Sequence, residues 1–298
     1  MSADLENLVI PVDKSAGLTT YDVIRRFKKV ARVGKVGHSG TLDPPARGLV
    51  LLLTGQATKL SGYLMDLPKT YVADIMLGSS TDTHDAEGTV TATGDWSGIT
   101  EDAVRGALPR FVGRRLQVPP MYSALKHRGT PLYTLARRGE QVEREPREVE
   151  TSSLELVSFE PPLFTVEVSC SRGMYVRVLA EELGGALDVP AHLAGLVRKR
   201  IGHFDLSAAV GDGDLERLAG MESPGFSLYD AMQHLPAVEL TPAQVQGVRN
   251  GIAPRAIGPA LRPGTLVRLA GPDRRLEAIA ETGPGGLLDL RRVFFGGE

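Results

Sequence analysis

A loop rich in glycine and proline, followed by a run of apolar residues, places the strongest constraint on the fold. The loop occupies residues 37–44, GHSGTLDP, and the run occupies residues 48–54, GLVLLLT. A short apolar run bounded by turn signals predicts a buried strand, and the glycines and proline predict a tight turn. A carboxylate in a loop held by a rigid strand is placed as catalytic groups often are. Asp43 is therefore a candidate catalytic residue, although aspartate is also a common turn former.

Ser39 offers a different interpretation of the same loop, the nucleophile elbow of a serine hydrolase. That pattern requires glycine where this chain has Thr41, and it requires a strand directly before the loop. The segment before residue 37 is itself a predicted loop, so the hydrolase interpretation is rejected.

The remaining periodicities predict a mixture of helices and strands. A helix is expected over residues 21–32, capped by Thr19 or Thr20, and a second over residues 175–183, ending at Gly184-Gly185. Strands are expected over residues 71–77 and 165–170 in addition to 48–54. Because these elements do not alternate in a regular βαβ order, the predicted class is α+β.

The C-terminal part of the chain differs in character from the rest. A break near residues 220–236 contains glycine and proline, and a short helix is expected within it. Beyond it, residues 265–269 and 276–280 are short strand-like runs separated by further glycine and proline. A small β module is therefore expected at the C-terminus.

Charge is strongly segregated along the chain, although the formal net charge is only −2. Residues 14–47 carry eight Lys or Arg and two Asp or Glu, residues 71–104 carry seven acidic residues and no Lys or Arg, and residues 105–138 carry eight basic residues and no acid. One such block is usually a solvated face. Two basic blocks on either side of an acidic one favour a surface that meets phosphate.

Residues 37–60, GHSGTLDPPARGLVLLLTGQATKL, resemble the nucleophile motif of the TruB family of tRNA pseudouridine synthases. Further matches follow in order over residues 8–205: a Lys-x-Tyr element at 69–71, a Thr-Asp-rich loop at 78–88, PPMYSALKHRGTPL at 119–132, CSRGMYVRVL at 170–179, and a Leu followed by basic residues at 196–200. The resemblance implies a catalytic domain over residues 1–232 with a central mixed, mostly antiparallel sheet. It also implies an RNA-gripping insertion at about 105–150 and a PUA-like β-barrel module at 236–298, although no motif in that module is specific.

The resemblance implies a role for each matching residue. Asp43 corresponds to the nucleophile, Arg177 to the arginine that pairs with it, and Tyr71 to the residue that stacks on the base and takes part in proton removal. The implied contacts with the target nucleotide are His38, Tyr71, Tyr175 and Leu196, and the implied RNA-binding residues of the insertion are Lys126, Arg128, Arg137 and Arg138. His38 would enter the RNA loop as the target base leaves its stack.

The implied reaction converts a uridine in the T loop of tRNA to pseudouridine. Uracil is detached from C1′ of its ribose and rejoined through C5, without redox change or net hydrolysis, so neither a cofactor nor a metal is expected. The three acidic residues and the histidine of the 78–88 loop (Asp82, Asp85, Glu87 and His84) are not expected to bind a metal. The sequence is compatible with attack of Asp43 at C1′, attack on the uracil ring, or a glycal route.

Two rival functions share part of this pattern. One is the guide-dependent enzyme of box H/ACA particles, which shares GHSGTLDP; the acidic loop and the complete insertion favour the stand-alone bacterial type. The other is a tRNA-folding protein whose catalysis is dispensable. The expected partner is the T stem-loop of tRNA, without membrane or obligatory protein partner, and the chain is expected to be a cytoplasmic monomer. A single cysteine, Cys170, excludes an intramolecular disulfide.

Overall fold

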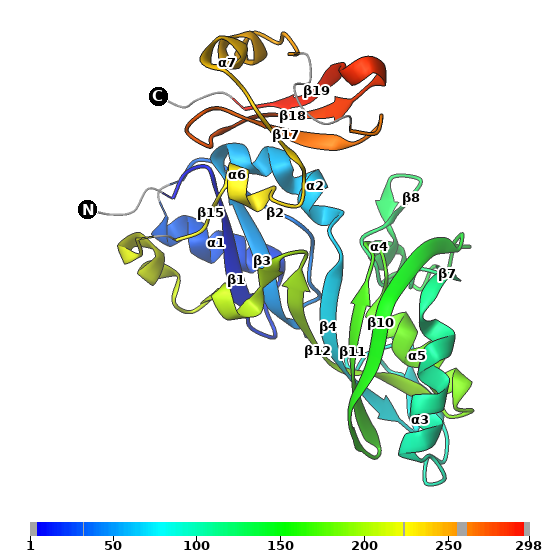
Figure 1. Cartoon of the computed structure of the whole chain (residues 1–298). Helices are drawn as coiled ribbons and strands as arrows, with labels where there is room; N and C mark the ends of the chain where they lie inside the picture. Colours follow the sequence, from blue (N-terminus) through cyan, green and yellow to red (C-terminus); the bar gives the residue numbers. More distant parts are fainter. Residues whose placement is uncertain (1–4, 32, 223, 255–260, 295–298) are drawn as a thin grey trace.

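The computed structural model describes residues 5–31, 33–222, 224–254 and 261–294, and its centre is one large sheet (Figure 1). In these residues the sheet has eleven strands, with both parallel and antiparallel pairs. Its main path runs in the order β14 (Val210–Gly211), β1 (Leu8–Lys14), β3 (Arg47–Thr54), β12 (Ala191–Ile201), β4 (Lys69–Leu77), β11 (Leu163–Cys170), β10 (Arg147–Glu160) and β7 (Gly113–Gln117). Three short strands join this path: β2 (Val36–His38), β13 (Phe204–Asp205) and β15 (Phe226–Ser227). Since only the β1–β14 and β12–β3 pairs are parallel, the predicted mixed and mostly antiparallel sheet is confirmed.

The apolar run at residues 48–54 forms most of β3 and is buried on both faces. Leu49, Leu51 and Leu53 pack into one cluster with η1 (Gly55–Leu60) and α2 (Ser61–Met65), whereas Val50 and Leu52 pack into another with α1 (Thr20–Val30) and η4 (Leu215–Gly220). Because successive strand residues point to opposite faces, a strand covered on both sides is apolar throughout. This explains why the run shows no alternation of polar and apolar residues.

The first predicted helix is α1, and Thr19 is its N-cap. The Thr19 side chain accepts a hydrogen bond from the Asp22 amide, and the Asp22 carboxylate accepts one from the Thr19 amide, each at 3.0 Å. This capping box satisfies two amides at the helix start. The helix ends at Val30, and Arg32, the predicted end, lies outside the described residues.

The second predicted helix is longer than expected, so its predicted end was wrong. Helix α5 (Val176–Ala186) continues through Gly184 and Gly185. A Cβ atom at Gly184 would lie 2.5 Å from the Cβ of Ala191 and 2.6 Å from the carbonyl oxygen of Val189. Gly184 therefore permits close packing of α5 against the start of β12, and it does not terminate the helix.

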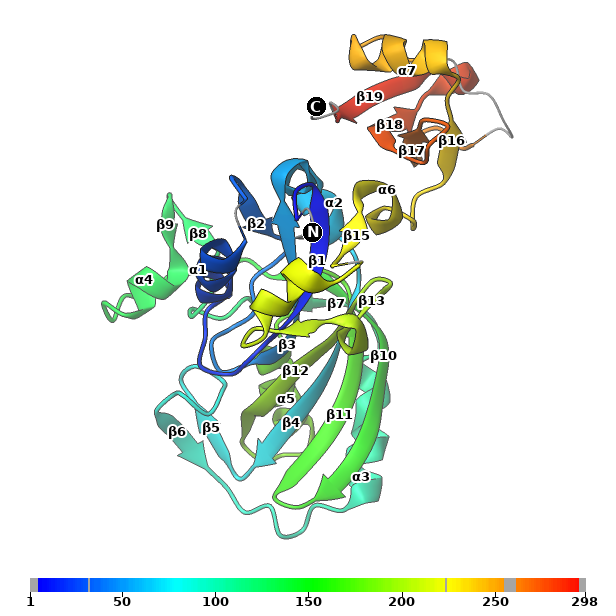
Figure 2. The ribbon, with the colours of Figure 1, turned by 90° about the vertical axis from the view of Figure 1, so that its left-hand side faces the viewer.

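The insertion projects from one edge of the sheet. Strand β7 and the start of β10 are paired within the sheet, so the projecting segment consists of residues 118–146. It contains β8 (Lys126–His127), β9 (Thr130–Pro131) and α4 (Leu132–Ala136), and Figure 2 shows these elements on the same side of the molecule as α1. The acidic loop forms the first strand and the turn of a separate hairpin, whose strands are β5 (Ser79–Thr81) and β6 (Val90–Thr93). Helix α3 (Glu101–Ala107) and η2 (Leu108–Phe111) follow this hairpin.

The C-terminal residues form a second, four-stranded sheet. Its order is β16 (Ala237–Glu239), β17 (Leu266–Ala270), β18 (Leu276–Thr282) and β19 (Leu288–Val293), with α7 (Pro242–Arg249) beside it. The connection passes through η3 (Leu206–Ala208), η4 and α6 (Leu228–Ala231), with Ser223 outside the described residues, and η5 (Pro284–Gly286) lies between β18 and β19. Leu276 and Phe294 pack into the same cluster as Leu51 of β3, so the two sheets share buried surface. In the described residues this second sheet is open, and a closed barrel stays a prediction.

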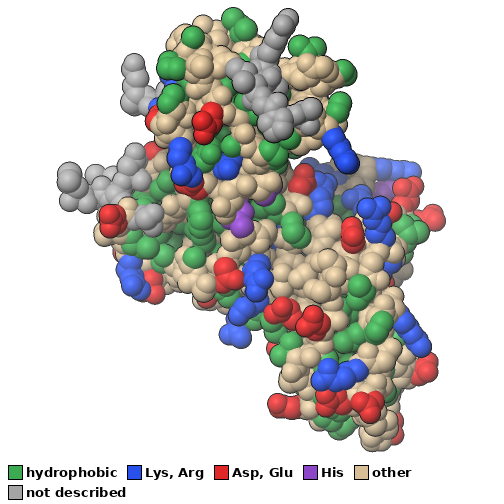
Figure 3. All heavy atoms as spheres, viewed as in Figure 1, with side chains coloured by type: hydrophobic (Ala, Val, Ile, Leu, Met, Phe, Trp, Pro, Cys, Tyr) green, Lys and Arg blue, Asp and Glu red, His purple; other side chains and the backbone are tan. Residues whose placement is uncertain are grey.

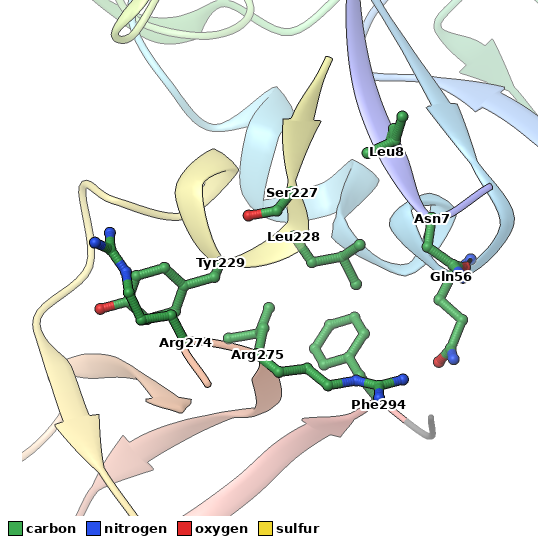
Figure 4. A pocket seen from close by; sticks show the side chains of 10 residues that line it. Asn7, Leu8, Gln56, Ser227, Leu228, Tyr229, Arg274, Arg275 and Phe294 are labelled. Atoms are coloured by element: carbon green, nitrogen blue, oxygen red, sulfur yellow. Dashed lines mark hydrogen bonds between the residues drawn. The ribbon is translucent and has the colours of Figure 1, made fainter. Parts of the chain in front are cut away.

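A cavity of about 190 Å³ lies at this junction. Figure 4 shows Asn7 and Leu8 on one side of it, Leu228 and Tyr229 of α6 on another, and Arg275 and Phe294, which adjoin β18 and β19, on the third. None of the residues predicted to act on substrate lines it. No helix of the described residues is long and apolar enough to cross a membrane.

Candidate functional site

Residues from four separate segments converge on one small cavity beside the 37–44 loop. The cavity has a volume of about 120 Å³, and five predicted site residues line it: Asp43, Tyr71, Tyr175, Arg177 and Leu196. Thr41, Leu42, Met174 and Val176 complete its wall. The structure therefore brings together all three predicted catalytic residues and three of the four predicted contacts with the target nucleotide.

Asp43 lies at the mouth of this cavity and its carboxylate faces Arg177. The Asp43 side chain is 44% exposed, and its Oδ2 lies 3.0 Å from Nη2 of Arg177. The turn that begins at Asp43 is closed by its backbone, because the Ala46 amide donates to the Asp43 carbonyl oxygen at 3.1 Å. The carboxylate is thus available for chemistry, which favours the catalytic interpretation of Asp43 over that of a simple turn former.

Arg177 connects three segments that are distant in the sequence. Its side chain is only 8% exposed. Besides Asp43, Nη2 donates to the Tyr122 carbonyl oxygen at 2.9 Å, and Nη1 donates to the Thr83 carbonyl oxygen at 3.1 Å and lies 3.5 Å from Oδ2 of Asp85. A planar guanidinium suits several partners at fixed angles better than an ammonium group does. One side chain therefore joins the acidic loop, the insertion and the loop at residues 37–44, which we call the catalytic loop.

Asp85 is a site residue that the sequence analysis missed. It is buried and supplies the second carboxylate beside Arg177, and its carboxylate also accepts hydrogen bonds from Thr83 Oγ1 at 2.5 Å and the Glu87 amide at 3.1 Å. The Thr-Asp-rich pattern of the loop was the available signal, but it was considered only as a possible metal site. Among the described residues, no group of three or more His, Cys, Asp or Glu could hold a metal ion.

A buried lysine holds the backbone next to Asp43 through hydrogen bonds to its carbonyl oxygens. Lys14 is fully buried on β1, and its Nζ donates to the carbonyl oxygens of Leu18, Pro44 and Ala46 at 2.8, 3.2 and 2.5 Å. Burial lowers the pKa of Lys14 to about 8. These bonds hold the backbone on the C-terminal side of Asp43.

Arg198 holds the backbone on the N-terminal side of Asp43. The sequence analysis assigned no role to this residue either. It is 2% exposed on β12, where it pairs with Gly48 on one side and Tyr71 on the other. Its Nε donates to the Leu49 carbonyl oxygen at 2.7 Å and its Nη1 to the Thr41 carbonyl oxygen at 3.2 Å. Gly48 allows this approach: its φ is +104°, and a Cβ there would lie 2.5 Å from the Arg198 carbonyl oxygen.

Arg198 also faces the hydroxyl group of Tyr71. Burial raises the pKa of Tyr71, and the charge of Arg198 and a hydrogen bond from its side chain oppose that rise. Because arginine has no acceptor, the phenolic oxygen accepts this bond, and its own O–H is free to point elsewhere. The same guanidinium thus orients Tyr71 and the catalytic loop.

We expect Arg198→Lys to lower the free energy of unfolding by about 1–3 kcal/mol, because a lysine ammonium cannot reach all of these acceptors and leaves buried oxygens unsatisfied. Urea unfolding followed by circular dichroism measures the effect. Arg200→Lys, at an exposed position that pairs with Asp205, is the matched control and should change stability by less than about 0.5 kcal/mol. Equal stability of the two variants would contradict the assigned role of Arg198.

His38 lies on the rim of the site and does not line the cavity. It ends β2, its ring Nδ1 accepts a hydrogen bond from the Gly40 amide at 3.1 Å, and burial lowers its pKa. A neutral, half-buried ring on the catalytic loop can stack on a nucleotide beside the cavity.

The basic block at residues 105–138 does not form one surface, which corrects the sequence interpretation. Arg105 and Arg115 lie on α3 and β7 and pair with Glu101 and Glu182. The predicted RNA-binding residues of the insertion are all exposed: Lys126, Arg128, Arg137 and Arg138. Figure 1 places α3 at the bottom of the structure, well below β8, and Figure 3 shows basic and acidic side chains next to one another over the insertion.

Comparison with known proteins identifies the family. Residues 28–176 match the N-terminal domain of the TruB family of pseudouridylate synthases. A curated tRNA pseudouridine synthase B of Geobacter sulfurreducens is 42% identical over 87% of this chain and 88% of its own length. The protein of the same name from Burkholderia pseudomallei is 44% identical over 97% of both chains.

Two solved structures contain chains with the same fold as this chain. A chain in a crystal structure of a Cbf5-Nop10-Gar1 complex superposes with a TM-score of 0.79 at 25% identity, over 98% of this chain and 86% of that one. The archaeal box H/ACA sRNP Nop10-Cbf5 complex contains a chain of the same fold, with a TM-score of 0.76 at 23% identity over 98% of this chain and 87% of that one. The chain therefore belongs to the TruB family of pseudouridylate synthases, a family of isomerases.

Proposed function

We propose that this enzyme converts a uridine in the T loop of tRNA to pseudouridine, with Asp43 as its nucleophile. The observation that carries the proposal is the ion pair between Asp43 and the buried Arg177 at the mouth of a cavity lined by Tyr71, Tyr175 and Leu196. The relatives named tRNA pseudouridine synthase B match almost the whole chain, which supports tRNA as the substrate.

The proposed chemistry needs an ionised carboxylate beside a flipped nucleotide. The Arg177 guanidinium directs one carboxylate oxygen of Asp43, and the half-exposed position of Asp43 leaves the other accessible. The aromatic rings of Tyr71 and Tyr175 can stack on the uracil while Leu196 covers its edge. A cavity of this size accepts one base, so the target nucleotide must leave its stack, and His38 on the rim is placed to occupy the space it leaves.

Tyr71 is proposed to take part in removal of the proton from C5 after uracil has rejoined the ribose. Tyr71 must act as its phenolate, which forms when the phenol gives up its O–H proton to solvent. The phenolate takes the proton from C5, and the bonding electron pair returns to the uracil ring. Burial raises the pKa of Tyr71 and so disfavours the phenolate. The positive charge of Arg198 stabilises the phenolate that this step requires.

Mapping pseudouridine in unmodified tRNA, after incubation with the purified chain alone, tests the proposed function. We expect one modified position in the T loop, and none in a tRNA whose T-loop uridine has been replaced. Modification of a bare T stem-loop would exclude the guide-dependent rival. Formation of product only with a guide RNA and partner proteins would contradict the proposal.

The insertion is proposed to hold the T stem-loop through its exposed basic side chains. Arg137 also lies 5.8 Å from the ring centre of Tyr133, so cationic and aromatic groups are adjacent there. We expect Arg137→Ala with Arg138→Ala to raise the Kd for tRNA roughly tenfold. The slope of log K against log salt should fall by up to about 2, because binding releases about one counterion fewer for each phosphate contact that is lost. Filter binding over a range of salt concentrations measures both.

The matched control removes two basic residues of the same block that lie outside the projecting segment 118–146, Arg105→Ala with Arg110→Ala on α3 and η2. This variant should keep the salt slope of the unmodified enzyme. Equal slopes for the two double variants would show that general charge, rather than the insertion, determines tRNA binding.

Two domains are proposed for this chain. We propose that residues 1–232 form the catalytic domain and that residues 236–298 form a PUA-like module that contacts the acceptor end of tRNA. Its four-stranded sheet and α7 fit a small RNA-binding module, and Arg262, Arg275 and Arg292 supply basic groups. A cytoplasmic location, a monomeric state, action without a cofactor or protein partner, and an additional tRNA-folding role stay predictions.

A further inference from the structure

Tyr21 is an exposed aromatic residue in the first turn of α1, next to the residue that joins this helix to the 37–44 loop. It is 69% exposed, more than any other large hydrophobic side chain of the described residues. The preceding residue, Thr20, is buried, and its Oγ1 accepts a hydrogen bond from the Leu42 amide at 3.1 Å. Since Leu42 adjoins Asp43, Tyr21 follows directly after the point where α1 is joined to the catalytic loop.

Two basic residues lie on the same flank of α1 as Tyr21. At 3.6 residues per turn, Tyr21, Arg25 and Lys28 fall within a narrow sector beside the buried stripe of Val23, Ile24 and Phe27. We call these three residues the α1 flank. Arg25 is 65% exposed and pairs with the capping residue Asp22 at 2.7 Å. Lys28 is exposed and has no ion pair or hydrogen bond within the described residues.

The position of Arg26 shows which way the α1 flank faces. Arg26 lies on the other side of the helix and pairs with Asp212, just before η4, at 2.6 Å. Helix α1 contacts η4 on that side and β2 on the other, as Figure 1 shows. The α1 flank therefore faces the side of β2, which ends at His38. The insertion and α1 lie on the same side of the molecule in Figure 2, and in Figure 1 they lie to the right and to the left of β4.

We infer that the α1 flank is a second RNA-binding surface, in which Tyr21 stacks on an unpaired base of the substrate RNA and Arg25 and Lys28 contact its phosphates. This inference rests on the proposed function and adds a subsite to it. Aromatic rings interleaved with basic groups are typical of binding to unpaired nucleotides. A protein partner would need a continuous apolar patch, but the other residues of this flank are charged. RNA bound to Asp43 would thus be held from the insertion on one side and from α1 on the other.

Fluorescence and binding experiments with an unmodified tRNA transcript test this inference. The chain has one tryptophan, Trp96, so Tyr21→Trp introduces a single new reporter. We expect the transcript to quench the added fluorescence, because stacking on a base quenches tryptophan. Tyr21→Ala should raise the Kd about tenfold, whereas Tyr21→Phe, which retains the ring, should stay within about twofold. The rate at saturating tRNA should not change in either variant.

Lys28→Ala should raise the Kd and lower the salt slope by up to about 1, whereas Arg105→Ala on α3 is the matched control and should do neither. An unquenched tryptophan at position 21, or equal losses for Tyr21→Ala and Tyr21→Phe, would overturn the inference. Because Tyr21 is exposed and lies outside the cavity, these variants should still form pseudouridine. Failure of the inference is therefore distinguishable from failure of the proposed function, in which the unmodified enzyme itself forms no pseudouridine in the T loop.

Discussion

The Asp43→Asn variant is expected to bind tRNA with a Kd within about threefold of the unmodified enzyme and to form pseudouridine at least about 10⁴-fold more slowly. An amide has nearly the same shape as a carboxylate, but it carries no charge and is a poor nucleophile. A loss of this size corresponds to about 5 kcal/mol of transition-state stabilisation. Single-turnover assays at saturating tRNA measure it, because they separate the chemical step from binding.

The fold of the variant should be almost unchanged. Asp43 is 44% exposed, and Arg177 keeps Asp85 and two carbonyl oxygens as partners. We therefore expect a loss of unfolding free energy of at most about 1 kcal/mol. Asp66→Asn is the matched control: Asp66 is also a half-exposed aspartate paired with an arginine, Arg172, and its substitution should leave the rate intact. Near-normal product from Asp43→Asn would remove Asp43 as the nucleophile.

Local patterns were sufficient to predict several of the helices and strands that hold the candidate site. The strand at residues 48–54 and the helix starting near Tyr21 were predicted because each depends on neighbours in the sequence, such as an apolar run or a capping residue. The end of α5 was predicted wrongly. Gly184 is required by its close contact with Ala191 and not by the end of the helix, and a local sequence pattern contains no information about that contact. The division of the 105–138 basic block was missed for the same reason.

The residues of the candidate site also divide into those that a local motif identified and those that it did not. Asp43, Tyr71, Tyr175, Arg177 and Leu196 were found from motifs, and the structure places all five around one cavity. Lys14, Asp85 and Arg198 were not assigned roles, since each acts through bonds to carbonyl oxygens or to a guanidinium on a distant segment. A sequence shows which side chains are present, but not which backbone groups they will satisfy. Buried charged residues are therefore the part of such a site that the sequence reveals least.

The second large effect is expected for Arg177→Lys. We predict that the rate of pseudouridine formation falls about 100- to 1000-fold and that the Kd for tRNA changes less than about fivefold. A lysine ammonium retains the charge, but it cannot contact Asp43, Asp85 and the Tyr122 carbonyl oxygen in the fixed directions of a guanidinium. Asp43 would lose its orientation, and misplacing a reacting group by about 1 Å can cost about 100-fold in rate.

A purely structural role for Arg177 predicts a different pattern. In that case the unfolding free energy would fall, and the rate of the folded enzyme at saturating tRNA would stay the same. The positioning role predicts that the rate falls even at low temperature, where the variant is fully folded. Arg172→Lys, at an exposed position near Tyr175, is the matched control and should change neither quantity.

Asp85→Asn provides an independent test of the same arrangement. It keeps the shape of the side chain and removes only the second carboxylate beside Arg177, so the rate should fall about 10- to 100-fold and Asp43 should keep its partner. If both residues act by orienting Asp43, the double variant with Arg177→Lys should be little slower than Arg177→Lys alone. Fully multiplicative losses in single-turnover rates would show that Arg177 and Asp85 act separately, and would contradict a shared orienting role.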